Sequence, residues 1–256
     1  MSIRFEHVTK SFGLKRVLEN ISFEVNRGEI LFIIGKSGVG KSITLKHIVG
    51  LTKPDSGSVF IDDQEVTTLS PLELANTRLK CGMVFQHPAL LDSLTIYENI
   101  AFGLKTQQYQ TRLGSPLTEE KIFEIVNKKL ALVHLPPHLL SRYPQELSYG
   151  MQKRVSLARA LAIEPNYLLF DEPTTGLDPI TTQAINNLIF DLSRRLHVTS
   201  VVVSHDMACA LKIADRILVL DQGRILEHSS IVEIKNSPNA LIHEFLSETL
   251  SLPPSQ

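Results

Sequence analysis

The stretch that decides the fold is Ile30–Val49, which reads ILFIIGKSGVGKSITLKHIV. Its central part, Gly35–Ser42, has the form G-x-x-x-x-G-K-S, in which glycines let backbone N–H groups turn inward around phosphate oxygens. The apolar run before the loop predicts a buried strand. The helical spacing of Leu45, Ile48 and Val49 predicts a helix whose N-terminus faces an anion. The sequence therefore predicts a phosphate-binding loop between a strand and a helix.

This loop supplies most of the expected contacts with a nucleoside triphosphate. The Lys41 ammonium is expected at the β- and γ-phosphates, and the Ser42 hydroxyl is expected to ligate Mg²⁺. The predicted nucleotide-binding residues of the loop are Gly35, Lys36, Ser37, Gly38, Val39, Gly40, Lys41 and Ser42.

Three further apolar runs end in polar residues. One run precedes Asp171 and Glu172, another precedes His205, and a third precedes Gln86. Two acids after a strand, or a single histidine, are usually structural. The carboxyl ends of parallel strands meet at one edge of a sheet, however, and there the same residues surround a ligand. We therefore expect Asp171 to hold Mg²⁺ through its water shell and Glu172 to polarise the attacking water.

The order of the predicted elements indicates an α/β chain. Strands are expected at 3–8, 20–25 and 29–34, and strand and helix alternate again beyond residue 165, which is typical of a mostly parallel sheet. Helical spacing from 118 to 163 predicts an inserted α-helical subdomain at about 87–163, and the polar stretch 107–116 is expected to be a loop. The predicted fold is a RecA-like P-loop NTPase core with an N-terminal antiparallel β subdomain. It forms one domain over 1–246, followed by a short disordered tail at 247–256.

Composition excludes several other classes of protein. The 256 residues carry 26 Lys and Arg against 27 Asp and Glu. The chain therefore lacks the net positive charge that is typical of nucleic-acid-binding proteins. Cys81 and Cys209 lie far apart, as expected of a reduced intracellular protein. No signal peptide is apparent at the N-terminus, and no apolar run approaches the ~20 residues that cross a bilayer.

The order of these motifs resembles the nucleotide-binding subunits of ABC (ATP-binding cassette) transporters over residues 1–246. The motifs are Gly35–Ser42, Gln86, Leu147–Met151, Leu169–Glu172, Gly176–Asp178 and His205. The resemblance implies that ATP and Mg²⁺ are bound, that Phe12 stacks on adenine and that His205 contacts the γ-phosphate. It also implies that Gln86 links Mg²⁺ and the attacking water to the transport partner, and that Asp178 lies at the interface between subunits. The expected assembly is a head-to-tail homodimer with transmembrane permease subunits, peripheral on the cytoplasmic face of the inner membrane.

The signature loop departs from the family pattern Leu-Ser-Gly-Gly-Gln. Here it reads Leu147-Ser148-Tyr149-Gly150-Met151. Ser148 and the amide of Gly150 at a helix start would form a second anion site, offered to the ATP of the other subunit. Tyr149 places a ring where the family has none. The ring either points away from the phosphate or weakens closure of the dimer.

The transported substrate is less clearly indicated. The stretch 89–96, Met151 and the stretch 178–181 are similar to ATPases of Mla/Mce-type phospholipid transport systems, which implies phospholipid transport with an Mce-domain partner. The alternative is an importer of a polar solute such as an amino acid. A nucleic-acid-associated ABC ATPase would show a second cassette, a coiled coil or a basic stripe, and a GTPase would need Asn-Lys-x-Asp. The sequence contains none of these features.

Overall fold

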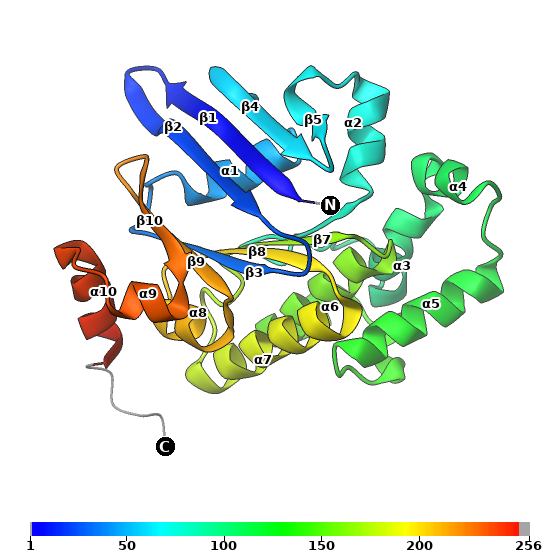
Figure 1. Ribbon diagram of the computed structural model, residues 1–256. Helices are drawn as coiled ribbons and strands as arrows, with labels where there is room; N and C mark the ends of the chain where they lie inside the picture. Colours follow the sequence, from blue (N-terminus) through cyan, green and yellow to red (C-terminus); the bar gives the residue numbers. More distant parts are fainter. Residues whose placement is uncertain (1, 251–256) are drawn as a thin grey trace. The chain divides into compact units, whose positions relative to one another are not determined.

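The chain divides into two compact units. The computed structural model describes residues 2–250, with only the backbone of 248–250. The first unit is Met1–Ser70 with Leu196–Gln256, and the second is Pro71–Arg195 (Figure 1). Of the predicted tail, residues 247–250 continue the last helix, and 251–256 lie outside the described residues.

The first unit contains a four-stranded sheet in the order β2-β1-β4-β5. Its strands are β1 (Ile3–Phe12), β2 (Lys15–Val25), β4 (Ser56–Ile61) and β5 (Gln64–Glu65). β1 and β2 form a hairpin in which Phe12 pairs with Lys15, and Gly13 turns the chain at φ 59. Both strands are longer than predicted, because backbone pairing continues through polar residues that show no apolar alternation. Stacked rings of Phe5 and Phe23, with centroids 4.5 Å apart, belong to the core of this sheet.

A second group of strands in the first unit surrounds the phosphate-binding loop. β3 (Ile30–Ile34) pairs in parallel with β8 (Thr199–Ser204) and β9 (Arg216–Asp221), and β10 (Arg224–Ser230) is antiparallel to β9. Every residue of β3 and β8 is buried. Helix α1 (Lys41–Ile48) contacts both β4 and β8, so it packs between the two sheets. The other helices of this unit are α8 (Met207–Ile213), α9 (Ile231–Lys235) and α10 (Ala240–Leu250).

The second unit combines a parallel strand pair with helices. β6 (Cys81–Val84) and β7 (Tyr167–Asp171) run parallel, and α6 packs on β6. The α-helices are α2 (Pro71–Arg78), α3 (Ile96–Ala101), α4 (Gln107–Leu113), α5 (Glu119–Leu132), α6 (Tyr149–Ala162) and α7 (Pro179–Leu196). Short 3₁₀ segments occur in the chain at Val66–Thr68, Phe102–Lys105, Pro137–Ser141 and Pro144–Glu146.

Helix α4 corrects the prediction of a loop over 107–116. The Thr106 side chain accepts a hydrogen bond from the amide of Tyr109, and Gly114 ends the helix in the left-handed conformation at φ 78. Tyr109 is buried, so one aromatic side chain holds an otherwise polar helix against the unit. A single buried position in two turns does not produce a recognisable periodic pattern.

The fold class is as predicted: parallel strands with helices, an antiparallel N-terminal sheet, and helices inserted between β6 and β7. Within residues 2–250, no helix combines the length and apolar character that a membrane span requires.

Candidate nucleotide-binding site

The phosphate-binding loop joins β3 to α1, and its backbone is closely packed. A Cβ atom on Gly35 would lie 2.2 Å from the carbonyl oxygen of Leu220. Gly40 has φ 109, and a Cβ there would lie 2.7 Å from the carbonyl oxygen of Val17. A side chain fits at neither position, and the φ of Gly40 is one that L-residues rarely adopt. The spacing of glycines in the sequence therefore has a direct steric cause.

Lys41 directs its ammonium into the loop. The side chain is 5% exposed, and Nζ donates to the carbonyl oxygens of Gly35 at 2.7 Å and Lys36 at 3.1 Å. Lys36, Ser37 and Gly38 on the outer part of the loop are exposed. A buried cation within a loop of accessible backbone groups, at the start of an eight-residue helix, suits a magnesium–triphosphate group.

His205 leaves the sheet beside this loop. Ser204, the last residue of β8, pairs in register with Ile34, the last residue of β3, so Gly35 and His205 both follow paired strand ends. The next residue, Asp206, caps α8 by accepting a hydrogen bond from the amide of Cys209 at 2.9 Å. The predicted meeting of these two strand ends is confirmed within the first unit.

Phe12 lies at the end of β1, next to the hairpin turn. Its ring is 50% exposed, and the Lys10 ammonium lies 5.3 Å from the ring centroid. A core residue in this sheet would be covered, as Phe5 is. An exposed ring beside a cation is able to stack on a nucleobase, so the geometry permits the predicted adenine contact.

The second unit brings three other predicted residues to one strand edge. Val84 pairs with Phe170 at the ends of β6 and β7, and Gln86 and Glu172 each follow two residues later. Asp171, at the end of β7, is 8% exposed. Glu172 has φ 48, a conformation that is uncommon for a residue with a side chain and that clusters at functional sites. Its carboxylate accepts a hydrogen bond from the Thr175 hydroxyl at 3.2 Å.

The signature residues lie at the start of α6. Ser148 caps this helix by accepting a hydrogen bond from the amide of Met151. A Cβ on Gly150 would lie 2.7 Å from Cγ2 of Thr181 on α7, so glycine allows the two helix starts to approach closely. Asp178 accepts hydrogen bonds from the Thr181 amide at 3.0 Å and the Thr181 hydroxyl at 2.6 Å. These hydrogen bonds, that from the hydroxyl foremost, lower the pKa of Asp178.

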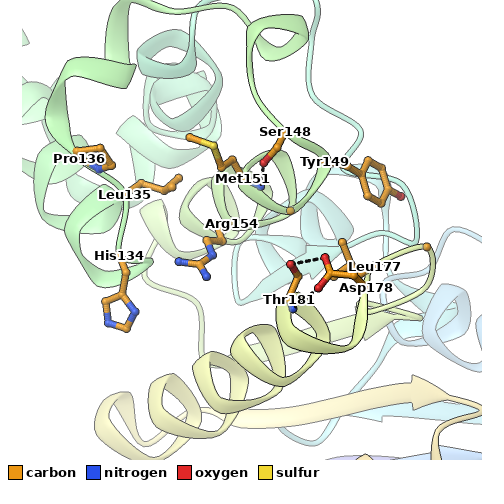
Figure 2. Close-up of a pocket in the computed structure, with 12 residues that line it drawn as sticks. His134, Leu135, Pro136, Ser148, Tyr149, Met151, Arg154, Leu177, Asp178 and Thr181 are labelled. Carbon is orange, nitrogen blue, oxygen red and sulfur yellow. Dashed lines mark hydrogen bonds between the residues drawn. The ribbon is translucent and has the colours of Figure 1, made fainter. Parts of the chain in front are cut away.

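A cavity of about 530 Å³ lies in front of these two helix starts (Figure 2). It is lined by His134, Leu135, Pro136, Ser148, Tyr149, Gly150, Met151, Arg154, Gly176, Leu177, Asp178 and Thr181. Three of the predicted residues, Ser148, Gly150 and Asp178, therefore share one concave surface. Sequence reasoning did not include His134 and Arg154, and nothing in the spacing of α5 and α6 indicated that they would line it.

Tyr149 turns toward the segment that contains Gln86. Its hydroxyl donates to the Gln86 carbonyl oxygen at 3.2 Å and lies 3.4 Å from Nδ1 of His87. Its ring also lies beside Gly176, where an added Cβ would be 3.6 Å from Cε1. In Figure 2 the ring is directed away from His134 and Arg154.

Lys153, one turn further along α6, also contacts this segment. It is 2% exposed, and Nζ donates to the carbonyl oxygen of Gln86 and, at 3.5 Å, to that of Phe85. Burial lowers the pKa of Lys153 to about 8, and the negative charge of Asp171 partly opposes this shift. Sequence reasoning missed Lys153. A lysine beside a signature motif carries no signal that it will be buried.

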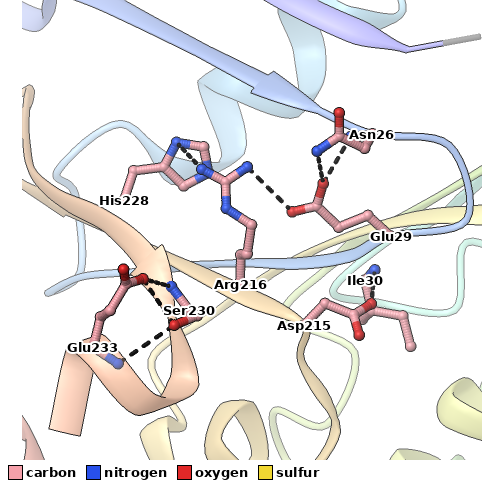
Figure 3. Close-up of polar contacts among 8 residues, drawn as sticks. All are labelled: Asn26, Glu29, Ile30, Asp215, Arg216, His228, Ser230 and Glu233. Atoms are coloured by element: carbon pink, nitrogen blue, oxygen red, sulfur yellow. Dashed lines mark hydrogen bonds and ion pairs between the residues drawn. The ribbon is translucent and has the colours of Figure 1, made fainter.

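A separate polar cluster in the first unit joins β9 and β10 to the turn before β3 (Figure 3). The Arg216 guanidinium lies 3.6 Å from the Glu29 carboxylate and 3.2 Å from Nδ1 of His228. Glu29 also accepts two hydrogen bonds from Asn26. Burial and then the charge of Arg216 lower the pKa of His228 to about 4. These groups contact one another, but Oε1 of Glu29 and Nε2 of His228 are buried and make no hydrogen bond within the described part of the chain.

Comparison with known proteins identifies the family. Residues 18–175 match the family model described as ABC transporter. The chain belongs to the ABC transporter family. It is 41% identical to the methionine import ATP-binding protein MetN of Carboxydothermus hydrogenoformans, over 92% of this chain and 68% of that protein. It is 39% identical to the sulfate/thiosulfate import ATP-binding protein CysA of Rhodopseudomonas palustris, over 99% of this chain and 70% of that protein.

Solved structures of cassettes agree with this result. The ATP-binding cassette MJ0796, a dimer bound to ADP and Pi, superposes with a TM-score of 0.80 at 32% identity, covering 90% of this chain and 98% of that one. The cbiO1 protein of Clostridium perfringens, part of the ABC transporter complex cbiONQ, gives a TM-score of 0.82 at 28% identity, covering 98% of this chain and 95% of that one. This cassette is the ATPase subunit of an ABC transporter. Such cassettes bind ATP with Mg²⁺ and couple its hydrolysis to transport.

The residues present are compatible with magnesium held mainly by phosphate and water. The described part of the chain contains no group of three or more His, Cys, Asp or Glu side chains that could hold a metal ion alone. Mg²⁺ in phosphate-transfer sites usually takes one or two protein ligands and keeps several waters. Ser42 and Asp171 supply oxygen atoms of the type that this ion prefers, as does the amide of Gln86.

Proposed function

We propose that this cassette binds ATP through the Gly35–Ser42 loop and hydrolyses it. The loop amides and Lys41 hold the phosphates, and the ring of Phe12 stacks on adenine. Ser42, Gln86 and Asp171 would hold Mg²⁺, which would supply positive charge to neutralise the phosphates. The observation that supports this assignment most strongly is the paired ends of β3 and β8, which place the loop and His205 at one strand edge.

Glu172 is proposed to act as the general base. A carboxylate at this position would accept a proton from the water that attacks the γ-phosphorus, while Lys41 and His205 stabilise the charge on the transferred group. The left-handed backbone of Glu172 and the hydrogen bond from Thr175 fix where its carboxylate lies. Gln86 would link Mg²⁺ and the attacking water to the transport partner.

Two copies are proposed to close head to tail over two ATP molecules. Ser148, Gly150 and Asp178 would then face the nucleotide held by the other copy. The shared cavity in front of α6 and α7 supports this proposal, as does the similarity to dimeric cassettes. Membrane-spanning permease subunits would bind the dimer at the cytoplasmic face of the inner membrane.

Import of a small polar solute is the proposed transport activity. The two relatives described above are named for import of methionine and of sulfate or thiosulfate, and both match nearly the whole chain. They favour this alternative over the phospholipid system predicted from sequence details. An extracytoplasmic solute-binding protein would then complete the complex in place of an Mce-domain protein.

Phospholipid transport is the second candidate, supported by three details of the sequence. The stretch 89–96, Met151 and the stretch 178–181 are similar to Mla/Mce-type ATPases. Cassettes with similar ATP sites serve different substrates, so the residues around ATP do not distinguish the two candidates.

The test is to purify the tagged cassette from membranes of the cells that naturally produce it, and to identify the chains that copurify with it. A permease with a solute-binding protein supports solute import, and a permease with an Mce-domain protein overturns it in favour of phospholipid transport. Equilibrium binding of labelled ATP with Mg²⁺ to the purified chain tests the ATP site. Failure to bind at millimolar nucleotide and magnesium would overturn the whole assignment.

A further inference from the structure

Helix α6 holds the backbone of residues 85–89 through side chains on three successive parts of the helix. Tyr149 and Lys153 donate to the carbonyl oxygen of Gln86. Arg159 donates to the carbonyl oxygens of Ala89 at 2.7 Å and Pro88 at 3.2 Å. Residues four apart on a helix face the same side, so Tyr149 and Lys153 reach one acceptor together. We refer to residues 85–89 as the Gln86 segment.

In the Gln86 segment only the side chain of Pro88 is buried. Phe85, Gln86, His87 and Ala89 are all exposed, and Ala89 adopts a positive φ of 49. Apart from the packing of Pro88, its position depends on what its carbonyl oxygens contact. The side chain of Gln86 remains available for a ligand because Tyr149 and Lys153 hold its backbone carbonyl group.

Burying a lysine on α6 is energetically costly, and an apolar side chain of the same length would pack there without that cost. Lys153 is covered almost completely, yet its ammonium does not reach solvent. It donates to the carbonyl oxygens of Phe85 and Gln86. The negative charge of Asp171 also acts on its ammonium group. The Lys153 ammonium thus contacts the backbone of Gln86 and interacts electrostatically with Asp171, and both residues are proposed to hold magnesium.

We propose that Lys153, assisted by the hydroxyl of Tyr149, is a positioning residue that fixes the Gln86 segment against helix α6, the helix that begins with the signature loop. Lys153 touches neither substrate nor metal and acts through the backbone of Gln86. Movement of the Gln86 segment would then be transmitted to α6, and movement of α6 to the Gln86 segment. This inference rests on the proposed role of Gln86 in ATP hydrolysis.

The substitutions that test this proposal change one contact at a time. Lys153→Met keeps the aliphatic stem and removes the donor, Lys153→Arg keeps a charged donor, and Tyr149→Phe removes only the hydroxyl. Lys128→Met on α5 is the matched control, because Lys128 is exposed and contacts neither the Gln86 segment nor α6 in any described interaction.

The first measurement is amide hydrogen exchange of the full-length chain without nucleotide. In Lys153→Met, exchange over residues 84–91 is expected to rise about tenfold, since a hydrogen bond to a charged group has been removed. Exchange over α8 should stay unchanged. Lys153→Arg should restore most of the protection, and Tyr149→Phe should raise exchange by about threefold.

The second measurement is steady-state hydrolysis of Mg-ATP by the same proteins. Lys153→Met should lower kcat about tenfold while KM for ATP stays within about twofold, because positioning is lost and binding through the Gly35–Ser42 loop is kept. Lys128→Met should match the unsubstituted chain in both constants. A residue with only a structural role would lower the melting temperature and leave kcat per folded molecule unchanged.

Unchanged exchange over 84–91 together with unchanged kcat in Lys153→Met would overturn the proposal. If Lys153→Met does not fold, Tyr149→Phe decides in the same way, because it preserves the ring and the helix. Failure of the unsubstituted chain to hydrolyse ATP would overturn the proposed function instead, and the exchange data would still show whether Lys153 holds the segment.

Discussion

The residues proposed to act on the nucleotide are held in different ways in the two units. In the first unit the site is mostly backbone: two glycines pack where no side chain fits, and Lys41 donates to the carbonyl oxygens of its own loop. In the second unit it is mostly side chains that hold other residues in place, such as Thr181 on Asp178 and Lys153 on Gln86. The first arrangement is suited to binding an anion. The second is suited to aligning the side chains that are proposed to take part in hydrolysis.

If the second unit supplies the chemistry, Glu172→Gln separates hydrolysis from binding. The expected result is a fall in kcat of roughly 1,000-fold, because a general base contributes about that much. Affinity for ATP should persist, and the protein should accumulate as a nucleotide-bound dimer on gel filtration. Glu120→Gln, on the exposed side of α5, is the control. Normal hydrolysis by Glu172→Gln would show that the base lies elsewhere.

If the first unit binds the phosphates of ATP, Lys41→Ala should weaken nucleotide binding. A roughly 100-fold loss of affinity for Mg-ATP is expected, since the ammonium makes charge-assisted contacts with phosphate. Equilibrium binding of a fluorescent ATP analogue measures it, and Lys46→Ala on the same helix serves as the control. Binding within twofold of the unsubstituted chain would contradict the assignment of the loop.

A smaller effect is expected at the edge of the first unit. Phe12→Ala should lower the affinity for ATP about tenfold, which is the usual effect of losing one aromatic ring stacked on a base. Leu14→Ala is a suitable control, because Leu14 is fully exposed in the same hairpin. Binding of inorganic triphosphate, which has no base, should be the same in all three proteins. Equal loss of ATP and triphosphate affinity would place Phe12 in a structural role.

The smallest expected effect concerns acid stability of the first unit. The pKa of His228 is about 4 in the fold, below its ordinary value of 6.5, so the unfolded chain binds more protons between these values. Stability should therefore decline as pH falls from 6.5 to 4, by roughly 1–2 kcal/mol once solvent screening of a half-buried ring is allowed for. Urea unfolding across this range measures it. His228→Gln should flatten the decline, whereas His243→Gln, at an exposed position on α10, should not.

The first unit could be predicted from the sequence far better than the second. The requirement for glycine and the strand–loop–helix pattern are local, so Gly35–Ser42 and the strand before it could be located from spacing alone. The ends of β8, β6 and β7 were also found, because buried parallel strands read as continuous apolar runs. The hairpin joining β1 to β2 was not, since most residues of its outer part are polar and do not alternate with apolar ones.

Contacts between residues distant in the sequence explain the remaining gaps. Tyr149 was recognised as a departure from the signature, but its hydrogen bond to Gln86 spans more than sixty residues of chain. Lys153 and Thr181 lie next to predicted residues and still gave no sign of their partners. Helix α4 depends on one buried tyrosine. Such features follow from packing between elements, which periodicity within one element does not encode.

Val17 of β2 lies against two glycines that are far apart in the sequence. Its carbonyl oxygen would lie 2.7 Å from a Cβ on Gly40 and 2.8 Å from a Cβ on Gly223, in the turn between β9 and β10. Adding a methyl group to Gly223 would push β2 toward the start of α1. A genetic screen for loss of nucleotide affinity would therefore be expected to recover changes in that distant turn, even though no residue of the turn belongs to the motifs that contact ATP.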